Sequence, residues 1–186
     1  GAAFLNGNTG LQTINMTDNT ISNNVVDNNF GGIYISNNLP TELQSVTIAN
    51  NVFDSNKAIS YAGALWIEAR NTSLQINSVT NNTFTNNVAA TFGGASAIRA
   101  YDSQQTTTLT NNTWKYNIAS FGGALYVYQN NTNHLNNATL LFQGNTFEQN
   151  VASNYGGVMY LYSGENGRQI IEFDADMFTN NTANDF

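Results

Sequence analysis

The residues of this chain that most plainly could undergo chemistry are asparagines in the tripeptide Asn-x-Ser/Thr, the acceptor for N-linked glycans. Asn and Thr are so common here that several such tripeptides would arise by chance, and 34 of the 186 residues are Asn. We predict that several are glycosylated in a secreted eukaryotic protein, with compositional accident as the alternative. Seven asparagines head such a tripeptide: Asn15, Asn71, Asn81, Asn111, Asn130, Asn137 and Asn180.

Acidic residues offer a weak candidate for a metal site. Glu172, Asp174 and Asp176 alternate along one segment, so in a strand all three would point to one side, where carboxylate oxygens could bind Ca²⁺. Like charges on a solvated face are the alternative interpretation. We predict no metal and no cofactor.

No arrangement of residues predicts catalysis. Cleavage of a polysaccharide needs clustered carboxylates or a base beside a groove. The single histidine, His134, lies in an Asn-rich insert and is expected to be a solvated loop residue. We predict that the protein is not an enzyme, with polysaccharide lyase or hydrolase chemistry as a minor alternative. The basic residues are scattered along the sequence, at Lys57, Arg70, Arg99, Lys115 and Arg168.

The composition excludes several classes of function. The net charge is −7, and five Lys and Arg could neutralise few phosphates, so we expect no nucleic-acid partner. No run of about 18 apolar residues is present to form a membrane span. The chain contains no cysteine, which excludes disulfides and thiolate metal sites. It begins without Met or a signal-peptide pattern, which we interpret as a processed or excised piece.

An internal repeat organises residues 1–186 as a single domain. Its anchor is an apolar residue followed three positions later by Asn, as in Phe53-Asp54-Ser55-Asn56. A turn rich in Gly and Ala follows each of the first five anchors. The steps between anchors are 32, 31, 30, 33 and 31 residues. The anchors are Ile21, Phe53, Phe84, Trp114, Phe147 and Phe178.

The two ends of the chain fit one another in this repeat. Phe186 followed by Gly1 and Ala2 would resemble Phe92-Gly93-Gly94, and Ile21 would then come 29 residues after Phe178. We expect a chain cut in mid-coil at both ends. Coils would then stack through Gly1 and Phe186, either between separate copies or within a longer parent chain.

The local pattern within the repeat is that of β-strands. Residues alternate in type after each glycine turn, as in Ala64–Glu68, Ala124–Tyr128 and Val158–Tyr162. Corners rich in Asn and Gly, which tolerate left-handed backbone angles, would separate two or three strands per coil. The sequence therefore predicts an all-β, single-stranded parallel β-helix of about six coils, each of about 31 residues. Further strands are expected at 11–16, 43–48, 74–79, 139–142 and 170–173.

The Asn that closes each anchor motif never heads a glycosylation tripeptide. We expect these six side chains to stack as an internal amide ladder that satisfies buried backbone groups at the corners, with a sugar or ion site as the alternative. The anchor aromatics should lie in the core. The ladder residues are Asn24, Asn56, Asn87, Asn117, Asn150 and Asn181.

The strand after each glycine turn carries a column of aromatic residues. Its aliphatic residues, such as Leu65 and Ile67, are expected to point inward, so the aromatic residues should point outward. The opposite assignment would bury Glu68 and Arg99 at a cost. An exposed aromatic column is typical of contact with another chain or of stacking against sugar rings; cover by the chain's own corners is the third possibility. The column consists of Phe4, Tyr34, Trp66, Tyr126 and Tyr160.

The pairing of this anchor with a Gly-Gly turn resembles the repeats of the chlamydial polymorphic outer membrane proteins. The resemblance covers nearly the whole chain. It implies a right-handed parallel β-helix and a role in surface display and adhesion. The turn occurs as Gly31-Gly32-Ile33, Gly93-Gly94-Ala95, Gly122-Gly123-Ala124 and Gly156-Gly157-Val158.

These features together predict a non-enzymatic structural protein, extracellular or on the cell surface. It would be a β-helical repeat unit of a fibre or surface filament that carries covalent N-glycans. Its coils would stack end to end by self-association or continue as a tandem array. The alternative is a surface adhesin, a carbohydrate-binding β-helix.

Overall fold

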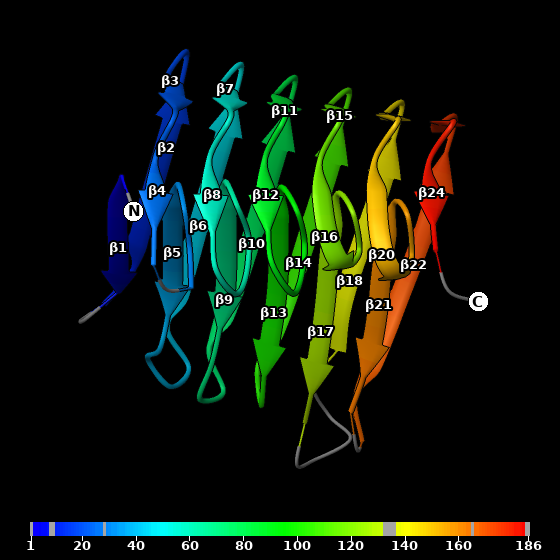
Figure 1. Ribbon diagram of the computed structural model, residues 1–186. Coiled ribbons are helices and arrows are strands. Elements are labelled where there is room, and N and C mark those ends of the chain that lie inside the picture. Colours follow the sequence, from blue (N-terminus) through cyan, green and yellow to red (C-terminus); the bar gives the residue numbers. More distant parts are fainter. Residues whose placement is uncertain (1, 8–9, 28, 132–136, 165, 185–186) are drawn as a thin grey trace.

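The computed structural model describes residues 2–7, 10–27, 29–131, 137–164 and 166–184. This part of the chain contains 24 β-strands and no helix. The strands wind into six coils that stack along one axis as a right-handed parallel β-helix (Figure 1). The all-β, single-stranded parallel β-helix of six coils is therefore confirmed.

Each coil contributes one strand to each of four parallel sheets, which we call A, B, C and D in chain order. Sheets A and B contain the longer strands. Sheet A consists of β1 (Ala3–Gly7), β5 (Ile33–Asn37), β9 (Leu65–Ala69), β13 (Ser96–Tyr101), β17 (Leu125–Asn130) and β21 (Met159–Ser163). Sheet B consists of β2 (Gln12–Thr17), β6 (Leu43–Ala49), β10 (Leu74–Thr80), β14 (Gln104–Thr110), β18 (Asn137–Gln143) and β22 (Arg168–Asp174).

Sheets C and D contain shorter strands, and the expectation of two or three strands per coil is wrong because the anchor motif itself forms a strand between two tight corners. Sheet C consists of β3 (Thr20–Ser22), β7 (Val52–Asp54), β11 (Thr83–Thr85), β15 (Thr113–Lys115), β19 (Thr146–Glu148) and β23 (Met177–Thr179). Sheet D consists of β4 (Val25–Val26), β8 (Lys57–Ala58), β12 (Val88–Ala89), β16 (Ile118–Phe121), β20 (Val151–Tyr155) and β24 (Thr182–Ala183).

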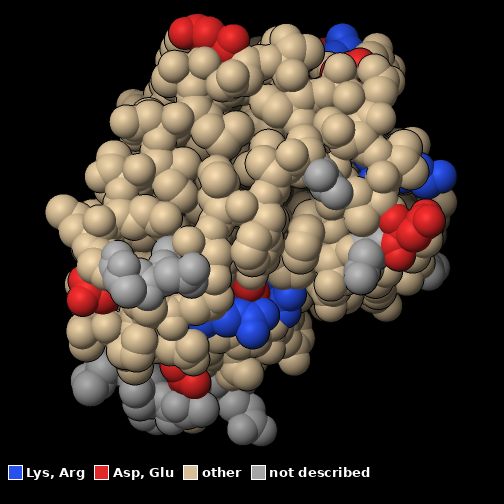
Figure 2. All heavy atoms as spheres, turned by 90° about the vertical axis from the view of Figure 1, so that its left-hand side faces the viewer, with Lys and Arg blue, Asp and Glu red and all other residues tan. Residues whose placement is uncertain are grey.

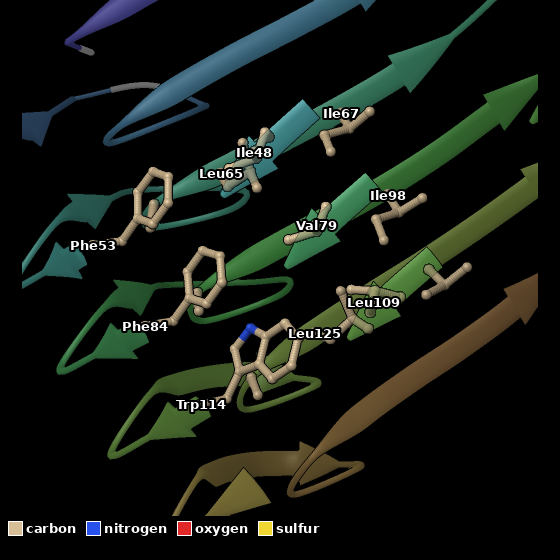
Figure 3. Packing of buried hydrophobic residues seen from close by; sticks show 14 of the residues in the cluster. Ile48, Phe53, Leu65, Ile67, Val79, Phe84, Ile98, Leu109, Trp114 and Leu125 are labelled. Carbon is tan, nitrogen blue, oxygen red and sulfur yellow. The ribbon is translucent and has the colours of Figure 1, made fainter. Parts of the chain in front are cut away.

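Stacking in register places equivalent side chains on top of one another in the core (Figure 3). Phe84 stacks on Phe53 with ring centroids 4.7 Å apart and on Trp114 at 5.2 Å, with the planes within 5° of parallel. Leu65 and Ile67 face these rings from sheet A (Figure 3). The anchors Phe53, Phe84, Trp114 and Phe147 are fully buried, as their repeat position predicts, whereas Phe178 in the sixth coil is 49% exposed.

A ladder of asparagine amides runs along the corner between sheets C and D. Asn87 donates both its backbone N–H and its Nδ2 to Oδ1 of Asn117, at 3.0 and 3.1 Å. Its Nδ2 also donates to the backbone carbonyl of Phe53 in the preceding coil. This pattern joins the six expected residues Asn24, Asn56, Asn87, Asn117, Asn150 and Asn181.

A second ladder, which we did not predict, runs along the corner between sheets B and C. Asn82 donates its backbone N–H and its Nδ2 to Oδ1 of Asn112, at 2.9 and 3.0 Å. Its sequence signal is an Asn two residues before each anchor, replaced in the last coil by an aspartate. The members are Asn19, Asn51, Asn82, Asn112, Asn145 and Asp176.

Each of these corners consists of two residues, the first with a left-handed backbone and the second a ladder residue. Asn81 and Asn111 have φ of 55° and 53°, and Asn86 has φ of 55°. Asn adopts this conformation more readily than other residues with a Cβ. The need for both conformations at every corner explains why Asn-Asn pairs recur along this chain.

A column of glutamines ties sheet B to sheet A inside the coils. Gln75 and Gln105 are joined through Nε2 of Gln105 and Oε1 of Gln75 at 2.6 Å. Their Nε2 atoms also donate to the backbone carbonyls of Glu68 and Arg99. In the next coil this position is Ala138, whose N–H donates instead to Oε1 of Gln129 from sheet A.

Candidate functional site

Sheet A presents two columns of side chains on the outside of the β-helix. Leu65 and Ile67 point into the core, whereas Trp66 belongs to a separate apolar cluster outside sheet A. The same alternation places Glu68 outside the coil. The outward direction that the sequence predicts for this column is therefore correct.

The column is not exposed along its length, however, because the chain covers it. Trp66 and Tyr126 have exposed fractions of 3% and 5%. Tyr61, from the segment between sheets D and A, lies with its ring centroid 4.8 Å from that of Trp66, and Phe92 lies 4.6 Å from Tyr126. Of the possibilities that the sequence left open, the structure therefore shows cover by the chain's own corners at Trp66 and Tyr126, whereas Phe4 is 61% exposed.

The covering rings form a column of their own. Tyr61 stacks on Phe92 at 5.2 Å, and Phe92 on Phe121 at 5.1 Å. Parallel bridges join the backbones at the same three residues. The aromatic residue that stands directly before most of the glycine turns was the available sequence signal for this second layer.

Beside the covered rings lies a buried carboxylate. Glu68 has an exposed fraction of 1%. It accepts a hydrogen bond from the hydroxyl of Tyr34 at 2.6 Å and forms an ion pair with Arg70 at 2.9 Å. Burial, followed by the hydrogen bond to Glu68, raises the pKa of Tyr34 to about 12. The same carboxylate raises the pKa of the Arg70 guanidinium.

Arg99, in the strand next to Glu68, lies among aromatic rings. Its Cζ is 4.8 Å from the ring centroid of Trp66, 5.0 Å from Tyr61, 4.8 Å from Tyr101 and 5.2 Å from Tyr128. Such contacts stabilise a guanidinium through the electron-rich ring faces. Arg99 is the register partner of Glu68, yet the Glu68 carboxylate pairs with Arg70.

Two of the basic residues that are scattered along the sequence therefore lie close together in the structure. Arg70 and Arg99 both pack against the ring of Tyr101, with Cζ 4.9 and 4.8 Å from its centroid. Figure 2, which views the rod from the end of the first coil, shows basic atoms gathered in a hollow of the surface with acidic atoms behind them. We define the Arg99 site as Arg99, Glu68, Arg70, Tyr101 and Tyr128.

The glycosylation tripeptides divide into two groups by position. Asn81, Asn111 and Asn180 are exposed and occupy the left-handed position of a corner, directly before a ladder Asn and a strand Thr. The corner thus produces Asn-Asn-Thr for structural reasons. The remaining acceptors do not coincide with the two ladder corners: Asn15 and Asn71 are exposed, and Asn130 and Asn137 are half-buried.

The weak metal candidate is not assembled. Asp176 lies beyond the end of β22 and serves the second ladder, whereas Glu172 and Asp174 are exposed. Among the described residues, no group of three His, Cys, Asp or Glu side chains could hold a metal ion. His134, Gly1 and Phe186 lie outside the described residues.

A second hollow, of about 320 Å³, lies on the outer face of sheet B. It contains no ionisable side chain, because its lining residues are Leu43, Leu74, Gln75, Ile76, Gln104 and Thr106.

Within the described ranges, no helix has the length and apolar character needed to cross a membrane. Comparison with family models, curated proteins and solved structures gives no significant match to this chain.

Proposed function

We propose that this chain is a non-enzymatic structural unit of an extracellular or cell-surface filament, in which the β-helix continues beyond the sixth coil, either into a second copy or along a tandem array. The observation that supports the proposal is the exposure of two aromatic side chains at the end of the sixth coil. Phe173 and Phe178 are 48% and 49% exposed, whereas their equivalents in the fifth coil, Phe142 and Phe147, are 1% and 0% exposed.

The exposed end has the chemistry of an internal coil contact. In each inner coil these columns are covered by the next coil, and the same columns begin in the first coil with Met16 and Ile21. A second copy placed one coil further would bury Phe173 and Phe178 and pair the strand edges that sheets leave at their ends. We therefore propose that a further coil covers this end, supplied by a second copy of this chain or by a longer parent chain.

N-glycans on exposed corner asparagines would complement this role. Asn81 and Asn111 occupy the same corner position in adjacent coils. Glycans there would project from one corner along the side of the rod and would leave both of its ends free. Treatment with an amidase that releases N-glycans should convert glycosylated asparagines to aspartate, which peptide mass spectrometry detects. Unmodified peptides throughout would exclude this part of the proposal.

The axial contact is tested by sedimentation velocity over a range of protein concentrations, with electron microscopy of the products. We expect the wild-type chain to grow into rods and Phe178→Glu to remain single. Ile76→Glu is the control, because Ile76 is 52% exposed on the side of the rod. A wild-type chain that stays single at every concentration would exclude association of separate copies. Loss of association with Ile76→Glu alone would indicate a lateral contact.

A further inference from the structure

We infer that the Arg99 site binds an anionic saccharide, a sugar unit that carries a carboxylate or a sulfate. This function goes beyond the structural role proposed above and does not depend on it. The site lies on the side of the rod and would be open in a single copy or in a filament.

The first argument is the charge balance of the site. Glu68 is neutralised by Arg70, at 2.9 Å, which leaves the charge of Arg99 without a counterion in the cluster. Arg99 forms no ion pair with any described residue. The site therefore has a local excess of one positive charge on a chain whose net charge is −7. A half-buried guanidinium gains most from an anion that completes the pair.

The second argument is the presence of hydrogen-bond donors without acceptors. Within the described part of the chain, the buried Nε of Arg99 has no hydrogen-bond partner. The same holds for the buried indole Nε1 of Trp66, whose ring is 4.8 Å from the Arg99 Cζ. Native proteins pair nearly all buried polar groups. Carboxylate and sulfate oxygens are the acceptors that match a guanidinium fork.

The third argument concerns the class of ligand. The strands of sheet A that carry the site are paired on both edges, so this face offers side chains and no free backbone edge for an extended peptide. Phenol rings line the site instead. Tyr128 and Tyr162 stack at 5.5 Å with planes 8° apart, and Tyr162 is 46% exposed. Phenolic hydroxyls at successive coils suit the hydroxyl groups of a sugar chain, and the rings suit its C–H faces.

The test compares four probes against the whole chain by isothermal titration calorimetry: a hexagalacturonate, a heparin hexasaccharide, maltohexaose and hexaglutamate. We expect the wild type to bind one or both acidic saccharides, more weakly as salt is added. Carboxylate and sulfate sources are distinguished by which of the two binds. Equal binding of maltohexaose, preference for hexaglutamate, or no binding of any probe would overturn the proposal.

Variants then assign the binding to Arg99. Arg99→Gln should weaken binding at least about tenfold, because the charge-assisted hydrogen bonds are lost. Arg99→Lys keeps the charge without the fork and should be intermediate. Arg168→Gln is the matched control, since Arg168 is exposed at the start of β22, and should change binding by less than about twofold. Unchanged binding by Arg99→Lys and by a folded Arg99→Gln would contradict the assignment.

Discussion

Asn145 donates its backbone N–H and its side-chain Nδ2 to the same carboxylate oxygen, Oδ1 of Asp176, at 2.7 Å each. One coil earlier, Asn112 makes the same two bonds to Oδ1 of Asn145 at 2.9 and 3.1 Å. The shorter distances agree with hydrogen bonds to an ionised acceptor. A carboxylate cannot donate in turn, so the second ladder has no side-chain donor in its sixth coil.

Asp176→Asn should therefore strengthen axial association. The new amide could donate to Oδ1 of Asn19 in the next copy, and one added hydrogen bond corresponds to about five- to tenfold in the dissociation constant. Sedimentation velocity would measure it. Asp174→Asn removes the same charge from an exposed side chain and is the control. If both variants associate equally tightly, reduced repulsion is the cause and the ladder is not.

Removal of an inner ladder residue should destabilise the fold. Asn117→Ala leaves the buried backbone N–H and Nδ2 of Asn87 without their shared acceptor, and Oδ1 of Asn150 keeps only the backbone N–H of residue 117 as its donor. We expect a loss of at least about 2 kcal/mol in the free energy of unfolding, measured by urea denaturation. Asn24→Ala is the control, because among the described residues no group donates to the Oδ1 of Asn24, so this variant strands no buried donor of a preceding coil. Equal losses would show that the ladder adds nothing beyond corner geometry.

The aromatic column of sheet A should stabilise the fold through packing. Trp66→Ala removes a ring that is 3% exposed, and we expect a loss of about 3–5 kcal/mol in the free energy of unfolding. Phe4→Ala, at a position 61% exposed in the same column, should cost about 0.5 kcal/mol or less. Denaturation curves test both. A stable Trp66→Ala variant that fails only to associate would restore the interpretation of this column as an interface.

Two tyrosines should ionise late in an alkaline titration. Burial raises the pKa of Tyr126, and burial together with the Glu68 hydrogen bond raises the pKa of Tyr34 to about 12. Because the folded pKa of Tyr34 exceeds the unfolded value near 10, its contribution to stability is complete below about pH 10 and is lost as the pH rises toward about 12.

The measurement is the growth of phenolate absorbance in a chain with nine tyrosines. The Tyr34→Phe, Tyr126→Phe double variant should lack this late phase. Tyr34→Phe alone should also reduce the steepness with which the free energy of unfolding falls above about pH 10. A late phase that persists in the double variant would contradict the assignment.

The repeat of anchors and asparagines was enough to predict the coils, because the spacing of equivalent residues gives the length of each coil and shows which residues stack on one another. It predicted the first ladder for the same reason. The second ladder was missed because Asp176 breaks its pattern and because Asn is abundant at the corners for its backbone preference as well. The cover over Trp66 and the meeting of Arg70 with Arg99 depend on how a turn folds back over sheet A, and alternation within a strand carries no information on that.

The in-register stacking of the six coils has an evolutionary consequence. Each coil presents the same core columns and ladder groups to both of its neighbours, so a coil can be gained or lost without a new core. In-frame duplication of about 31 codons would lengthen the rod by about 4.8 Å. Recombination between repeats could then change the length of the rod one coil at a time, while the corner, ladder and ring positions of every other coil are unchanged.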